Sequence, residues 1–77
     1  MLVDITQLKP GEEGIIVQLL GGPGLIRRMQ SLGVRIGKKV KKVSSHFWHG
    51  PQTIEIDNLK IAIGYGLAKK IIVEVKR

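Results

Sequence analysis

The two histidines of this 77-residue chain are its clearest candidates for metal chemistry. His46 and His49 flank Phe47 and Trp48 within the stretch SSHFWHGP, residues 44–51. Imidazole is the commonest metal ligand among side chains, so the pair suggests binding of Fe²⁺ or Zn²⁺. On an extended strand, however, residues three apart point to opposite faces, and a transition metal takes about four ligands. We therefore predict that any metal here bridges two molecules, with the histidine loops of a symmetric homodimer supplying four imidazoles.

Catalytic chemistry has little support in the sequence. The chain has no cysteine, which excludes thiolate nucleophiles and thiolate metal sites. The acidic pairs Glu12-Glu13 and Glu55/Asp57 lie beside a turn and on the outer face of an expected strand, away from both histidines. The glycine-rich GGPG at 21–24 lacks the Lys-Ser or Lys-Thr that a nucleotide-binding loop requires. We predict a protein that acts by binding and is not an enzyme.

Positive charge dominates the surface chemistry. Thirteen Lys and Arg against six Asp and Glu give a net charge of +7, which favours polyanions or acidic protein surfaces. The basic residues gather at 27–28, 38–42, 69–70 and 76–77. Only one Phe, one Trp and one Tyr are present, too few for a base-stacking platform. We expect no nucleic-acid partner, and an RNA- or ribosome-binding β-barrel stays open as the alternative.

Short strands are the elements that position these residues. The apolar, β-branched run at 14–20 predicts a strand buried on both faces. Four further strands are predicted, at 38–48, 53–57, 59–64 and 71–76. Turns are expected at Gly50-Pro51 and Asp57-Asn58. Val40 and Val43 stand three apart, so a bulge is needed to turn both toward the interior.

One short helix is predicted after the first strand, in the stretch LIRRMQSLGV. Leu25, Met29 and Leu32 recur at helical spacing and form one apolar stripe. Pro23 suits the first helical turn, and Gly33 suits a left-handed C-terminal cap. A further single turn of helix is expected near GYGLA, before the last strand.

The order of these elements indicates a small all-β barrel of about five strands with one short helix after the first. Closure into a barrel removes the exposed edges that five separate strands would leave. No run approaches the ~20 apolar residues of a membrane span, and the first residues lack the pattern of a secretory signal. We expect a soluble cytoplasmic protein.

The ordered set of motifs resembles the FeoA-like family. The resemblance rests on LKPGEEGIIVQL, LIRRMQSLGVRIGKKVKKV, GPQTIEI and LKIAIGYGLAKKIIVEV, which together extend from Leu8 to Val75. It implies one SH3-like barrel domain over residues 1–77. Free-standing members are similar to the cytosolic accessory protein of ferrous-iron uptake, which acts with the membrane transporter FeoB. Related barrels form a module of metal-dependent repressors, but this sequence has no helix-turn-helix region, which favours the accessory role.

Candidate partner-binding residues follow from the same resemblance, which implies that the helix and the GGPG before it protrude and meet a partner. Gly22, Leu25, Arg27 and Arg28 are the candidates there, and Trp48 is a further one because aromatic anchors carry interface energy. The alternatives are a solvated helix face and a tryptophan that covers one end of the barrel. The family pattern does not include the HxxH of His46 and His49, so the resemblance gives the metal site no support.

Overall fold

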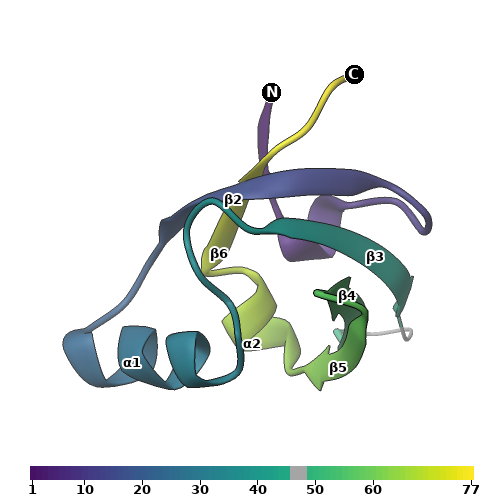
Figure 1. Cartoon of the computed structure of the whole chain (residues 1–77). Coiled ribbons are helices and arrows are strands. Elements are labelled where there is room, and N and C mark those ends of the chain that lie inside the picture. The colour runs from purple at the N-terminus through teal and green to yellow at the C-terminus, as the bar shows by residue number, and fades with distance from the viewer. Residues whose placement is uncertain (46–48) are drawn as a thin grey trace.

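The computed structural model describes residues 1–45 and 49–77 as one curled antiparallel sheet with short helices (Figure 1). The strands are β1 Leu2–Asp4, β2 Glu13–Leu19, β3 Lys39–Ser45, β4 Gln52–Ile56, β5 Leu59–Ile63 and β6 Ile71–Glu74. The helices are the 3₁₀ turn η1 Ile5–Gln7, α1 Pro23–Ser31 and α2 Tyr65–Ala68. Strands neighbour one another in the order β1-β6-β2-β3-β4-β5, so β1 and β5 are the two end strands of the barrel.

The prediction of an all-β barrel is confirmed, with two differences. The described residues form six strands rather than five; the additional one is β1, which is only three residues long and was not predicted. It pairs with β6 over Leu2–Glu74, Val3–Val73 and Asp4–Ile72. Closure is also incomplete, since the strand order joins neither end strand to the other within the described part of the chain.

Strand β2 is buried on one face only, so the prediction of two-sided burial is wrong. Ile16 is fully buried, whereas Ile15 is 41% and Val17 is 40% exposed. A bulge between Ile16 and Gln18 shifts the register of β2 against β6. A short apolar run does not reveal how many layers cover it. Here the sheet curls around a single core, and no described element lies over its outer surface (Figure 1).

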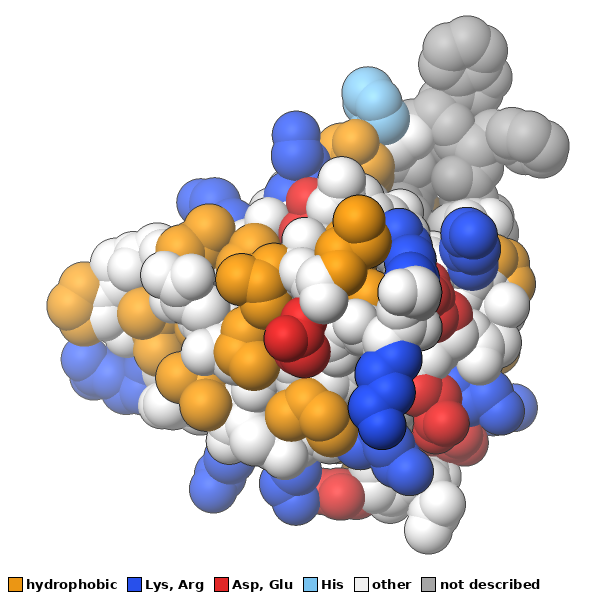
Figure 2. Space-filling model, turned by 90° about the horizontal axis from the view of Figure 1, so that it is seen from above, with side chains coloured by type: hydrophobic (Ala, Val, Ile, Leu, Met, Phe, Trp, Pro, Cys, Tyr) orange, Lys and Arg blue, Asp and Glu red, His pale blue; other side chains and the backbone are white. Residues whose placement is uncertain are grey.

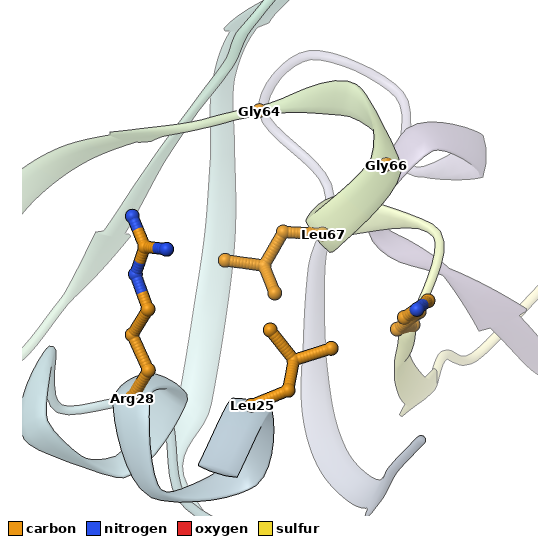
Figure 3. A pocket seen from close by; sticks show the side chains of 6 residues that line it. Leu25, Arg28, Gly64, Gly66 and Leu67 are labelled. Atoms are coloured by element: carbon orange, nitrogen blue, oxygen red, sulfur yellow. The ribbon is translucent and has the colours of Figure 1, made fainter. Parts of the chain in front are cut away.

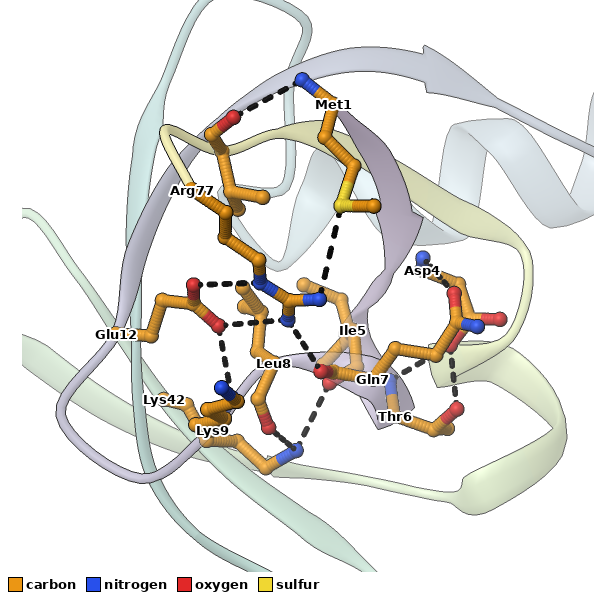
Figure 4. A network of polar contacts seen from close by, with 11 residues as sticks. Met1, Asp4, Ile5, Thr6, Gln7, Leu8, Lys9, Glu12, Lys42 and Arg77 are labelled. Carbon is orange, nitrogen blue, oxygen red and sulfur yellow. Dashed lines mark hydrogen bonds and ion pairs between the residues drawn. The ribbon is translucent and has the colours of Figure 1, made fainter.

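The basic strand β3 has a lysine in the interior. The predicted bulge is present, between Lys42 and Ser44, and Val40 is buried, but Val43 is only half-buried. Lys42 is 1% exposed, and its Nζ donates to the carbonyl oxygens of Ile5 at 2.8 Å and Leu8 at 3.2 Å (Figure 4). Burial lowers the pKa of the Lys42 ammonium. This side chain therefore ties β3 to the end of η1.

Helix α1 begins at Pro23, as its place in the first turn predicted, and Gly33 has the expected left-handed φ of +92°. Met29 is fully buried and Leu25 packs against the core. Leu32 does not continue the stripe: it lies beyond the last helical residue and is 45% exposed. The helix ends one residue earlier than the apolar spacing suggested, because Leu32 is its C-cap and the chain turns away there.

The remaining strands follow their predicted alternation. Ile54 and Ile56 of β4, Ile63 of β5, and Ile71 and Val73 of β6 all face the core. The β4–β5 turn is confirmed, with φ of 52° at Asp57 and 66° at Asn58, the backbone of a tight hairpin turn. The interior is one cluster: Val3, Ile5, Leu8, Ile16, Leu19, Met29, Val34, Val40, Ile54, Ile56, Ile63, Ala68, Ile71, Val73 and Val75.

Candidate functional site

A groove of about 320 Å³ separates the two α-helices. Its lining comes from α1, from α2 and from the residue before β6: Leu25, Arg28, Gly64, Gly66, Leu67 and Lys70. In Figure 3 the side chains of Leu25 and Leu67 point toward each other across the groove, and the Arg28 side chain extends beside them. Because α1 projects from the barrel, this opening lies at the edge of the fold (Figure 1).

The glycines before α1 position the Leu25 side of the groove. Gly21 has a φ of +123°, and a Cβ there would lie 2.8 Å from Leu25 Cδ2. The backbone conformation therefore requires glycine, and a side chain at this position would also displace the Leu25 side chain. Gly22 is the N-cap of α1, and its carbonyl accepts the amide of Ile26 at 3.0 Å. The stretch that resembles a phosphate loop serves instead to start the helix and to seat Leu25.

The short helix α2 supplies the opposite wall. The Ala68 amide donates to the Gly64 carbonyl at 2.9 Å, and Ala68 is fully buried, which anchors this single turn. Leu67 is half-buried and packs on the core beside the groove. A Cβ at Gly64 or Gly66 would meet no atom within 4 Å, so these glycines leave the upper rim open. The groove thus has an apolar floor and an accessible mouth.

Positive charge surrounds this floor. Arg27 and Arg28 lie on α1, and Lys69 and Lys70 follow α2. None of these four takes part in the ion pairs found among residues 1–45 and 49–77. The segment 14–54, which includes α1, carries seven Lys and Arg and no Asp or Glu. An apolar floor with a cationic rim suits an acidic partner segment that presents one apolar side chain.

His49 lies against α2 next to the groove. His49 stacks on Tyr65, with ring centroids 4.3 Å apart and planes at 19°. Lys69 Nζ lies 5.6 Å from the centre of the same Tyr65 ring. His46 and Trp48 lie outside the described residues. No group of three or more His, Asp or Glu that would hold a metal occurs in the described part of the chain, and the bridged Fe²⁺ or Zn²⁺ site stays a prediction.

The structure brings some of the predicted partner-binding residues together. Leu25 and Arg28 line the groove, Gly22 caps the helix that carries them, and Arg27 is exposed on α1 outside the lining. The sequence interpretation missed the α2 side of the groove, with Leu67 and Lys70. A signal was present, since the basic pair 69–70 directly follows a short apolar turn.

Comparison with known proteins identifies the family. Residues 3–75 match the FeoA domain. The chain belongs to the FeoA family. It is 42% identical over 66 residues to the "Putative Fe(2+) transport protein A" of Methanocaldococcus jannaschii, an alignment that covers 86% of this chain and 78% of the relative. The crystal structure of an iron uptake regulatory protein (FeoA) matches with a TM-score of 0.88 at 34% identity, covering 95% of this chain and 96% of that one.

The same fold occurs in transcriptional repressors. A manganese-dependent transcriptional repressor matches with a TM-score of 0.88 at 17% identity, and this chain covers 42% of it. That is a likeness of fold alone. The match to the FeoA domain and to the FeoA crystal structure confirms the predicted resemblance and the SH3-like barrel. None of the helices in residues 1–45 and 49–77 is long and apolar enough to cross a bilayer.

Proposed function

We propose that this FeoA-family chain is a cytoplasmic accessory protein of ferrous-iron transport that binds the transporter FeoB through the groove between α1 and α2. Two similar proteins are named for Fe²⁺ transport and for iron uptake, which supports the pathway. The observation that carries the contact is the groove itself, an apolar floor whose rim cations form no ion pair within residues 1–45 and 49–77. The protein acts by binding and not by catalysis.

The contact joins two kinds of interaction. An apolar side chain of FeoB enters between Leu25 and Leu67, and acidic groups of FeoB lie against Arg28 and Lys70. Full burial of one large aliphatic side chain contributes about 1.5–3 kcal/mol. Exposed ion pairs contribute at most about 1 kcal/mol each. The apolar contact therefore sets most of the affinity, while the cations orient the partner and speed its association.

Binding of the purified cytosolic part of FeoB, measured by isothermal titration calorimetry, tests this proposal. We expect Arg28→Glu to weaken binding by about ten-fold or more, because it replaces an attractive rim charge with a repulsive one. Lys60→Glu on the exposed face of β5 changes the net charge equally and should leave binding within about three-fold. Equal losses in the two variants, or no binding by the unmodified chain, would exclude the groove as the contact. Thermal unfolding checks that both variants are folded.

A further inference from the structure

The outer face of the sheet carries exposed apolar side chains around β1 and β2. Eight large hydrophobic side chains are exposed in the described part of the chain, and five belong to the first twenty residues: Met1, Leu2, Ile15, Val17 and Leu20. Figure 2, which looks down on the top of the molecule in Figure 1, shows hydrophobic side chains gathered on this surface with acidic and basic ones between them. The sequence makes β2 apolar on both faces, and the fold covers only one.

The strand register arranges these residues in a definite order. Leu2 of β1 lies beside Glu74 of β6, Glu74 lies beside Ile15 of β2, and Ile15 lies beside Lys39 of β3. We call these four residues the outer row. Neighbouring strands are about 4.8 Å apart, so a carboxylate and an ammonium flank Ile15 at similar distances on opposite sides. All four are exposed. Ile72, which lies two residues before Glu74 on the same face of β6, adjoins them.

We propose that the outer row binds a second copy of this chain, with the two-fold axis running parallel to β2 over Ile15. Rotation about such an axis exchanges the β6 side of the face with the β3 side. Glu74 of each copy then lies against the partner's Lys39, and Ile15 packs on the partner's Ile15. The surface is self-complementary, as a two-fold interface requires.

Charges already near the outer row are compatible with this pairing. Glu74 contacts the Met1 amino group at 2.5 Å, and Lys39 Nζ lies 3.7 Å from Glu13 Oε2. The paired side chains are 51% to 65% exposed, so these ion pairs contribute little to stability and leave both charges accessible. Glu13 lies two residues before Ile15 on β2, so the axis brings it near the partner's Glu13, and Lys41, its cross-strand neighbour on β3, reduces this repulsion.

The charge balance favours a second copy over an acidic or basic partner. The outer row has one charge of each sign, whereas an acidic partner would meet Glu74 and a basic one would meet Lys39. Three strand spacings of about 4.8 Å make the row narrower than a standard interface of roughly 800 Å² per partner. The dimer is therefore weak and reversible. Figure 1 places β2 at the top and the two helices below it, so pairing leaves the α1–α2 groove accessible.

Reciprocal charge reversal, followed by sedimentation equilibrium of the whole chain from about 10 μM to about 1 mM, tests the proposal. The unmodified chain should dimerise within this range. Glu74→Lys and Lys39→Glu should each weaken self-association by about ten-fold or more, because each brings like charges together. An equimolar mixture of the two variants should associate as well as the unmodified chain, and so should the double variant, because opposite charges then face each other again.

Three results would overturn the proposal: a monomer throughout the range, single variants that still dimerise, or a mixture that fails to recover. Ile15→Ser, at an exposed position, should also weaken the dimer, and Lys60→Glu should not. Metal is removed with EDTA, so association through the histidine loops is excluded. FeoB binding is tested with a different variant, Arg28→Glu. The proposed dimer can therefore be disproved while the proposed FeoB contact at the groove still holds, and the reverse.

Discussion

The outer row and the α1–α2 groove are both apolar surfaces flanked by charge, but their charges differ in sign pattern. In the outer row, Glu74 and Lys39 stand on either side of Ile15. At the groove, Leu25 and Leu67 are accompanied by cations only, among them Arg28 and Lys70. A balanced pattern can pair with its own copy, whereas a single-sign pattern repels its copy and requires an acidic partner.

The two surfaces also differ in how they are connected to the core. Leu25 and Leu67 pack against the core from their half-buried positions, so the groove is part of the fold as well as a candidate contact. Ile15 and Val17 point away from the core, and the buried cluster does not include them. Substitutions should therefore separate stability from binding in the outer row and change both at the groove.

The largest effect on stability is expected within β3, where Lys39 is exposed and Lys42 is buried. Lys42→Ala leaves the Ile5 and Leu8 carbonyls without their ammonium donor and opens space in the interior, so the free energy of unfolding should fall by about 3 kcal/mol. Lys39→Ala, three residues earlier and exposed, should change it by less than about 0.5 kcal/mol. Urea unfolding of both variants measures the difference, and equal values would show that the burial of Lys42 does not contribute to stability.

Local signals explain which parts of the fold could be predicted. Pro23 and Gly33 mark the ends of α1 by their own backbone preferences, and Ile54 and Ile56 alternate with polar residues in β4. Lys42 gave no such signal, because a lysine is usually solvated and its partners, Ile5 in η1 and Leu8 just after it, lie more than thirty residues away. Burial of charged side chains depends on tertiary contacts that spacing along the chain does not encode.

The candidate site was predictable on one side only. Leu25 and Arg28 stand on one short helix, so their spacing and the GGPG before it indicated a projecting surface. Leu67 and Lys70 reach the groove from α2 and the residue before β6, about forty residues later in the chain. Only the path of the sheet brings these segments together. The same limitation made β2 look buried on both faces.

The second prediction tests the different connections of the two surfaces to the core. Leu67→Ala should lower the free energy of unfolding by about 1–2 kcal/mol, since a half-buried leucine loses part of its packing. Ile15→Ala should change it by less than about 0.5 kcal/mol, because Ile15 is 41% exposed. Thermal and urea unfolding measure both values. A loss for Ile15→Ala as large as that for Leu67→Ala would mean that the outer row also supports the fold.

The third prediction uses salt to distinguish the charge patterns. Raising NaCl from about 50 mM to about 500 mM should weaken FeoB binding by about ten-fold, because the screened charges of the groove all have one sign. Self-association through the outer row should change by less than about three-fold, because its net charge is zero and apolar contact remains. Isothermal titration calorimetry measures FeoB binding at each salt concentration, and sedimentation equilibrium measures self-association. Equal salt dependence would contradict the contrast between the two surfaces.

The smallest effect concerns the ion pair beside the outer row, between Glu12 and Arg77 (Figure 4). Arg77 donates to both Glu12 carboxylate oxygens, at 2.9 and 3.0 Å, and the Lys9 amide donates a further bond at 3.0 Å. These bonds, that of Arg77 above all, lower the pKa of Glu12 from 4.5 to about 2. The pair therefore stabilises the fold fully above pH 4.5, and its contribution is lost as the pH falls toward about 2.

Arg77→Ala should accordingly flatten the dependence of stability on pH between 4.5 and about 2. The slope should not vanish, because the Lys9 amide still holds the carboxylate. Arg77→Lys, which keeps the charge but cannot bond both oxygens in the same way, should give an intermediate slope. Urea midpoints at a series of pH values measure these slopes. Parallel curves for the three proteins would mean that the bond between Glu12 and Arg77 does not contribute to the pH dependence of stability.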